Sequence, residues 1–267
     1  MSSAPPLGTE LRRPVGQLLR AWRERRRLSQ LDLAIAADIS ARHLSFVETG
    51  RARPSREMVL RLAERLDVPL RERNDLLLAA GYAPVYARTA LNSPRLAPIR
   101  AAVRRVLAAH EPFPAVAVDR LWRLVETNAG IALLTGGVAP HLLAAPANAL
   151  RLTLHPEGLA PRIANLGEWR AHLLGRLRRQ LDLTEDPELA ELYEELRAYP
   201  CDQPEPEAEL PGPGDVAVPL RLRHPEGELT FVSTVSTFGT ALDITVAELS
   251  IESFFPADDR TAAFLRG

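Results

Sequence analysis

Side chains between Gln30 and Ser55 carry the chemistry that reads or holds a nucleic acid. Arg42 can donate two parallel hydrogen bonds to a guanine edge, and Phe46 or Ala41 can touch a thymine methyl group. Nearby hydroxyl, amide, imidazole and guanidinium groups suit contacts with phosphate. His43 could instead face solvent or pack, and Phe46 could belong to a core. The candidate DNA-binding residues are Gln30, Ser40, Ala41, Arg42, His43, Ser45, Phe46, Arg51, Arg53 and Ser55.

Two short helices joined by a tight turn would bring these residues to one surface. Ser29 is a favourable N-cap with Asp32 three positions later, and Ser40 caps the next helix, which Gly50 ends. Such a pair is a helix-turn-helix unit, whose second helix enters the major groove with its N-terminal residues first. The expected helices of this all-α domain cover residues 16–27, 30–37, 41–49, 56–66 and 69–81.

The charge divides the chain into two parts. Residues 1–100 hold 18 arginines and 10 acids, whereas residues 101–267 hold 15 arginines and 24 acids. The basic part favours a polyanionic partner such as DNA, although a solvated helix face has the same composition. Prolines between the two parts indicate a linker. We therefore expect a flexible N-terminus over 1–15, a DNA-binding domain over 16–81, a linker over 82–98 and a second domain over 99–267.

The second domain is predicted to be α+β, with a mainly antiparallel five-stranded sheet. Alternating and β-branched segments indicate the strands, and apolar residues at helical spacing indicate the helices. A proline- and acid-rich loop is expected over 200–219. The expected strands are 115–118, 122–125, 216–222, 229–238 and 242–251, and the expected helices are 99–109, 169–181, 187–196 and an uncharged one starting after Asn128.

Residues 16–80 resemble the Cro/cI-like (XRE) class of helix-turn-helix regulators. Asp38 departs from the class, which usually has glycine there in a left-handed turn. The resemblance implies that Arg23 pairs with Glu48 and fixes the first helix to the third. The matching positions in RERRRLSQLDLAIAADISARHLSFVETGRARPS are Ser29-Gln30, Leu33-Ala34, Ile39-Ser40, Glu48-x-Gly50 and Pro54-Ser55.

Residues 105–255 resemble the PAS-like, MmyB-like ligand-binding domain of bacterial regulators. The resemblance lies in PAVAVDRLWRLVETNAG and ANALRLTLHPEGLAPRIANLGEWRAHL. It implies a one-component sensor with an apolar pocket for a fatty-acid-like or other lipophilic ligand. The best matching positions are Pro114-Ala115, Trp122, Asn128, Asn148, Leu150, Pro156 and Trp169.

Nine residues are candidates for binding that ligand. The wall candidates are Trp122, Leu154, Trp169, Phe231 and Phe238, and the candidates for a polar head group are Asn128, Asn148, Arg151 and His172. Each has a plain structural alternative: core packing for the aromatic residues and His172, a helix cap for Asn128, a loop hydrogen bond for Asn148 and a surface position for Arg151.

The sequence lacks the usual enzyme signatures. No HExxH, GxSxG or GxGxxG motif is present, and without lysine the chain offers neither a Schiff base nor a P-loop. The six histidines show no close metal-ligand spacing, so we expect no metal and no cofactor beyond a possible bound fatty acid. No signal peptide is visible, and glycines and prolines interrupt the uncharged stretch 127–150, which favours a cytoplasmic protein without a membrane span.

We therefore expect a non-enzymatic transcription regulator that binds double-stranded operator DNA as a homodimer. Two alternatives stay open for the second domain: a ligand-free dimerisation scaffold, or an enzyme domain tethered to DNA.

Overall fold

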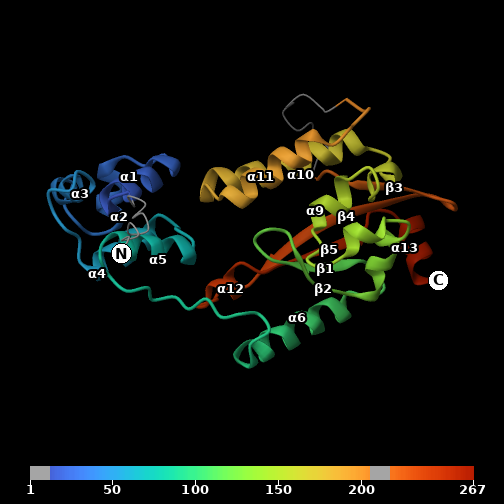
Figure 1. Ribbon diagram of the computed structural model, residues 1–267, viewed down its shortest axis with the longest axis horizontal. Helices are drawn as coiled ribbons and strands as arrows, with labels where there is room; N and C mark the ends of the chain where they lie inside the picture. The colour runs from blue at the N-terminus through green and yellow to red at the C-terminus, as the bar shows by residue number, and fades with distance from the viewer. Residues whose placement is uncertain (1–12, 205–216) are drawn as a thin grey trace, which may run out of the picture. The chain divides into compact units, whose positions relative to one another are not determined.

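The computed structural model describes residues 13–204 and 217–267. The chain divides into two compact units, which Figure 1 draws in one view. Of the described residues, 13–88 and Leu242–Ile244 form the first unit, and 89–204, 217–241 and 245–267 form the second. Most of the expected N-terminal segment 1–15 and of the expected loop 200–219 lies outside the described residues.

Short helices with matched caps build the first unit. Ser29 accepts a hydrogen bond from the backbone of Asp32 in a complete capping box, and Ser40 and Ser55 cap the third and fourth helices. The prediction of an all-α five-helix domain is confirmed. The helices are α1 (Val15–Arg25), α2 (Gln30–Ala36), α3 (Ala41–Glu48), α4 (Arg56–Arg65) and α5 (Leu70–Ala79).

Two backbone positions fix how these helices pack. Asp38, in the turn between α2 and α3, has φ 53°, the left-handed conformation that aspartate tolerates better than most residues. Gly16 lies so close to α3 that an added Cβ would stand 2.2 Å from the carbonyl oxygen of Val47. Helix α1 therefore lies directly against the C-terminal part of α3, which the buried Leu44 and Val47 anchor in the core.

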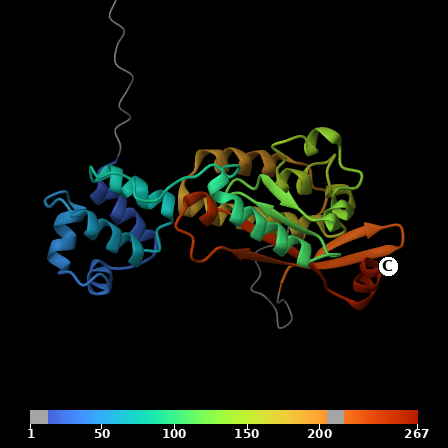
Figure 2. The ribbon, with the colours of Figure 1, turned by 90° about the horizontal axis from the view of Figure 1, so that it is seen from below.

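A five-stranded sheet forms the centre of the second unit (Figure 2). Its spatial order is β2-β1-β5-β4-β3, and every neighbouring pair is antiparallel. The predicted PAS-like α+β class with an antiparallel five-stranded sheet is confirmed. The strands are β1 (Ala115–Val118), β2 (Leu124–Thr127), β3 (Leu220–His224), β4 (Gly227–Thr237) and β5 (Ser250–Pro256).

Side chains alternate across this sheet and meet helices on both faces. On one face, Ala115, Ala117 and Ile251 pack against α6 (Ala97–Ala109), which runs along the sheet in Figure 2. On the other face, Val116 and Phe254 join the main core with residues of α9 (Ala149–Leu154) and α10 (Leu166–Thr184). This alternation turns Glu252, between Ile251 and Phe254, toward the main core.

Further helices connect and flank the strands. They are η1 (Pro94–Leu96), η2 (Ala129–Ile131), α7 (Ala132–Thr135), α8 (Pro140–Leu143), η3 (Ala160–Arg162), α11 (Pro187–Ala198), α12 (Ile244–Ala247) and α13 (Asp259–Arg266). The uncharged stretch after Asn128 thus holds short helical turns rather than one long helix. Within the part of the chain that is described, no helix has the length and apolar character needed to cross a membrane.

Two strand predictions need correction. Trp122 lies before its strand, in a turn with φ 63°, and β2 begins only at Leu124. The predicted strand 242–251 is wrong over most of its length, because residues 244–247 form α12 and β5 begins only at Ser250. The β-branched residues Ile244, Thr245 and Val246 misled the prediction, because β-propensity reflects packing between neighbouring strands. In the described part of the chain, this segment has only an isolated bridge between Asp243 and Ala87.

Candidate DNA-binding surface and ligand cavity

The exposed side of α3 carries the candidate base-reading residues. Arg42 is exposed, and its guanidinium carbon lies 5.4 Å from the centre of the Phe46 ring. Ala41, His43, Ser45 and Phe46 are all half-buried, while the opposite side of the helix is in the core. The stacked ring holds Arg42 along the helix without using any of its N–H donors, so the donors stay available for a base.

A buried ion pair fixes the position of α3 relative to α1. Arg23 Nε lies 2.7 Å from Glu48 Oε1, and Arg23 Nη2 donates to Glu48 Oε2 at 2.9 Å, in the bidentate geometry that carboxylates favour. Arg23 Nη1 also donates to the carbonyl of Leu28 at 2.8 Å, and Gln30 Nε2 donates to Glu48 Oε2 at 2.8 Å. The pairing implied by the resemblance is therefore present, and the Gln30 amide belongs to the same network.

The other candidate DNA contacts have local roles as well. The hydroxyls of Ser40 and Ser55 accept the capping hydrogen bonds of their helices. Arg53 donates from Nε and Nη2 to the carbonyl of Ala80, which joins the segment before α4 to the end of α5. Arg51 is exposed just after α3. A hydroxyl that accepts a capping bond still has its own hydrogen to donate to a phosphate.

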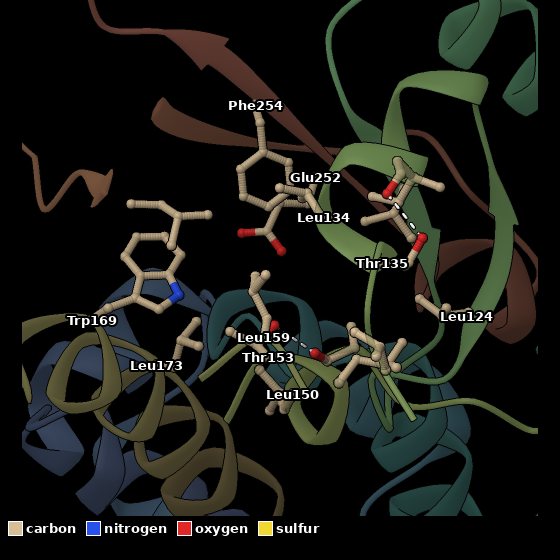
Figure 3. A pocket seen from close by; sticks show the side chains of 16 residues that line it. Leu124, Leu134, Thr135, Leu150, Thr153, Leu159, Trp169, Leu173, Glu252 and Phe254 are labelled. Carbon is tan, nitrogen blue, oxygen red and sulfur yellow. Dashed lines mark hydrogen bonds between the residues drawn. The ribbon is translucent and has the colours of Figure 1, made fainter. Parts of the chain in front are cut away.

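An apolar cavity of about 60 Å³ lies in the second unit against the sheet (Figure 3). It offers room for roughly four water-sized groups and is partly open to solvent, so that a longer chain can extend beyond it. The wall comes from β1, β2, β5, α7, α9 and α10 and is almost entirely aliphatic or aromatic. Its lining residues are Val116, Leu124, Ile131, Leu134, Thr135, Val138, Ala149, Leu150, Leu152, Thr153, Leu159, Trp169, Leu173, Leu220, Glu252 and Phe254.

One charged side chain, Glu252, reaches this wall. The Glu252 side chain is 8% exposed, and its Oε1 accepts a hydrogen bond from Arg176 Nη1 at 2.8 Å. Arg176 also lies over the ring of Trp122, 4.7 Å from its centre. Sequence reasoning missed Glu252, although a single acid at an inward position of the apolar segment SIESFFP was a usable signal.

Of the nine predicted ligand-binding residues, only Trp169 lines this cavity. Asn128 is buried beside β1, where it accepts from Ala115 N and donates to the carbonyls of Leu107 and Phe113. Asn148 caps α9 and donates to the carbonyl of Leu121. Both amides thus hold backbone segments together.

Trp122 and Arg151 also have protein partners. Trp122 Nε1 donates to Gln180 Oε1 at 3.0 Å. Arg151 forms a bidentate pair with Glu195 at 2.8 and 2.6 Å, which joins α9 to α11. These hydrogen bonds lower the pKa of Glu195 and raise that of Arg151, and they occupy two of the donors that a ligand carboxylate would need.

The remaining candidates lie in or near the apolar core. Leu154 and Phe231 belong to the main core, and Phe238 packs beside the small cluster under α6. His172 stacks on Trp169 with ring centres 5.3 Å apart. Burial, followed by the nearby charges of Arg176 and Arg179, lowers the pKa of His172.

Folding also brings two distant histidines together. Among the described residues, His141, His155 and Glu157 form a group whose possible metal-ligating atoms all lie within 4.8 Å of one another. His141 Nε2 stands 3.9 Å from Glu157 Oε2, and His155 Nδ1 accepts from the backbone N–H of Glu157. The His155 ring also packs edge-on against Tyr199. Two imidazoles and a carboxylate are a donor set that suits zinc and similar ions.

Comparison with known protein families assigns a family to each of the two units. Residues 99–267 match the family described as "MmyB-like transcription regulator ligand binding domain", and residues 14–76 match a "Helix-turn-helix domain". The chain belongs to the MmyB-like regulator family. It combines a helix-turn-helix domain with an MmyB-like ligand-binding domain.

Other comparisons add little to this assignment. No curated protein matches the regulator. Among solved structures, one titled "Structure of an RNA-binding Light-Oxygen-Voltage Receptor" aligns with 15% identity and a TM-score of 0.25. That alignment covers 94% of this chain and about 62% of the other, and a TM-score this low carries no argument about function.

Proposed function

We propose that this regulator is a one-component sensor of the XRE type. Its domain over residues 16–81 binds operator DNA, and its domain over residues 99–267 takes a lipophilic, fatty-acid-like ligand that changes operator affinity. The apolar cavity on the sheet is the observation that carries the ligand role, because a concave, mostly apolar wall with a few polar groups is the usual form of a small-molecule site. A cytoplasmic location agrees with a DNA partner.

We propose that α3 reads the major groove. The exposed Arg42 and the adjacent Phe46 supply the base contacts, with Ala41, His43 and Ser45 beside them. Gln30, Ser40, Arg51, Arg53 and Ser55 supply phosphate contacts around this helix. Because Arg53 and Gln30 already bond within the domain, their phosphate contacts come from the remaining N–H groups of each side chain.

We further propose that the regulator binds as a homodimer on a pseudo-palindromic site. One recognition helix contacts only a few base pairs, so two copies supply the specificity that a single one lacks. Sedimentation of the full chain with and without a selected duplex measures this directly. A complex with one copy per operator would overturn the dimer.

The DNA-reading assignment is tested by Arg42→Ala. Operator sequences are first selected from a random duplex library with the wild-type chain, and affinities are then compared with those for a scrambled duplex. We expect Arg42→Ala to lose about 1–3 kcal/mol of discrimination at one base position. The matched control is Arg65→Ala, an exposed arginine at the end of α4. Unchanged selectivity in Arg42→Ala would remove this residue from the interface.

The ligand role is tested by native mass spectrometry of the purified chain, followed by denaturing extraction. A retained acyl-chain compound that alters operator affinity when added back supports the sensor. A dimer without such a compound, whose operator affinity no lipophilic additive changes, supports a dimerisation scaffold instead. Chemical conversion of an added ligand would indicate an enzyme domain.

A further inference from the structure

The cavity contains a hydrogen-bond donor with no acceptor. Trp169 is 2% exposed, and among the described residues its indole Nε1 has no hydrogen-bond partner. Figure 3 shows the indole nitrogen turned toward the space that Glu252 and Leu159 also border. A buried N–H without a partner is costly, and the great majority of such groups in folded proteins are paired. A molecule in the cavity that accepts a hydrogen bond from Trp169 Nε1 would remove this cost.

The same cavity also contains a carboxylate with bonding capacity left over. Arg176 bonds to Oε1 of Glu252, and Figure 3 shows the carboxylate group of Glu252 directed into the space between the labelled side chains. A carboxylate accepts about four hydrogen bonds, so a single arginine contact leaves room for a donor. The Glu252 carboxylate can therefore accept a further hydrogen bond from a molecule bound in the cavity.

The other polar side chains of the wall do not supply a hydrogen-bond donor for a ligand. The hydroxyl of Thr153 donates to the carbonyl of Ala149 at 2.7 Å, and that of Thr135 donates to the carbonyl of Ile131 at 3.2 Å. Their hydrogens are thus used within their own helices, and the other lining residues are apolar. Among the side chains of the wall, Trp169 is therefore the one with a free N–H donor, Glu252 is the charged acceptor, and the two hydroxyl oxygens can only accept.

We propose that the cavity selects an uncharged, hydroxyl-bearing lipophilic ligand. The ligand O–H donates to Glu252, and the same oxygen accepts from Trp169 Nε1. This inference deepens the proposed sensor function and rests on it. An ionised carboxylate has no donor and is repelled by Glu252, an ammonium group has no acceptor for Trp169, and an ether has no donor for Glu252. A fatty acid fits only in its uncharged form.

Four six-carbon-scale probes separate these head groups. They are hexan-1-ol, hexanoate, hexylammonium and 1-methoxypentane, which share a similar apolar body. Each is titrated into the full chain at pH 7, and the indole N–H signals of the three tryptophans are followed by NMR. Because a hydrogen bond to a charged group is strong, we expect hexan-1-ol to bind about tenfold more tightly than each of the others. We also expect it to shift the Trp169 signal downfield.

Variants assign the two contacts. Trp169→Phe keeps an aromatic wall but removes the donor, so the roughly tenfold preference for the alcohol over the ammonium should shrink. Glu252→Gln removes the charge and should raise hexanoate binding relative to hexan-1-ol. Thr184→Val is the matched control, because it changes a threonine of α10 that does not line the cavity and whose hydroxyl donates to the carbonyl of Gln180, and it should preserve the order of the four probes.

The outcomes distinguish the failure of the hydroxyl preference from the failure of the proposed ligand-sensing function. Hexanoate binding as tightly as hexan-1-ol in the wild type would overturn the hydroxyl preference and leave a lipid sensor standing. An unchanged ratio of the hexanoate and hexan-1-ol affinities in Glu252→Gln would do the same. If none of the four probes perturbs the Trp169 signal, the ligand role of the cavity itself is contradicted. If hexylammonium bound more tightly than hexan-1-ol, Glu252 would still contact the ligand, but the hydrogen bond from Trp169 Nε1 to the ligand would be contradicted.

Discussion

Two buried arginine–glutamate pairs, one in each unit, differ in how completely they are bonded. Glu48 receives two bonds from Arg23 and one from Gln30, and its side chain is 1% exposed. Glu252 receives one bond from Arg176 and otherwise borders a cavity. A fully bonded pair contributes to one fixed arrangement of helices, whereas a partly bonded pair keeps capacity for a ligand. The number of hydrogen bonds that each carboxylate already accepts therefore distinguishes the structural pair from the pair at the binding site.

The largest effect is expected from Glu48→Ala in the first unit. The change removes the buried carboxylate that Arg23 binds and leaves only that of the exposed Glu24, 3.8 Å away. Removing one partner of a buried pair typically costs about 3–5 kcal/mol. Urea denaturation followed through the indole signal of the buried Trp22 measures the free energy of unfolding of this unit. The control is Glu64→Ala, which removes an exposed acid of α4 outside this network and should leave the midpoint unchanged. A small loss of unfolding free energy in Glu48→Ala would mean that water can satisfy the Arg23 guanidinium in place of the Glu48 carboxylate.

A smaller effect is expected from Arg176→Leu in the second unit. The single bond to Glu252 is lost, but the carboxylate keeps its access to the cavity, so we expect a loss of about 1–3 kcal/mol. The Trp169 indole signal reports the unfolding of this unit. A loss as large as that of Glu48→Ala would show that both pairs are structural, and it would remove the contrast between them.

The smallest effect concerns the pH dependence of the second unit. Burial lowers the pKa of His172, with Arg176 and Arg179 adding to the shift and Glu168 opposing it. Between the lowered pKa and the ordinary value of about 6.5, the unfolded chain binds more protons than the folded one. The stability that His172 contributes is therefore complete above about pH 6.5 and is lost as the pH falls through the folded-state pKa.

His172→Gln should flatten that slope of unfolding free energy against pH. His141→Gln, which changes an exposed histidine, is the control and should leave the slope as it is in the wild-type chain. An identical slope in the wild type and in His172→Gln would assign the pH dependence to other groups.

The first unit was predictable because its determinants are local. Ser29 with Asp32, Ser40, Ser55 and Gly50 set helix ends through contacts within three or four residues. The Arg23–Glu48 pair followed from a resemblance that also covered these caps. The DNA contacts expected for this unit stay predictions, and the structure adds that Gln30 and Arg53 are already hydrogen-bonded within the domain.

The second unit was predictable in class but only partly in detail. Residue types and alternation gave the antiparallel sheet, yet Trp122 fell in a turn and residues 244–247 became a helix. The polar candidates Asn128, Asn148 and Arg151 have the features of ligand contacts, but each found a protein partner. Apart from the local cap of Asn148, the partners Ala115, Leu121 and Glu195 lie 13, 27 and 44 residues away, and helical or strand periodicity carries no information about such pairs.

The amino-acid sequence by itself determined the two-part architecture, the helix-turn-helix unit and the family of the second domain. Capping residues, apolar periodicity and turn residues act over a few positions, and the sequence displays them directly. Only the tertiary structure decided which side chains border the cavity. Strand β5 brings Glu252 beside residues of α9 and α10 that lie some 80 or more positions earlier in the chain, because the sheet order and the alternation of its faces depend on the folding of the whole domain.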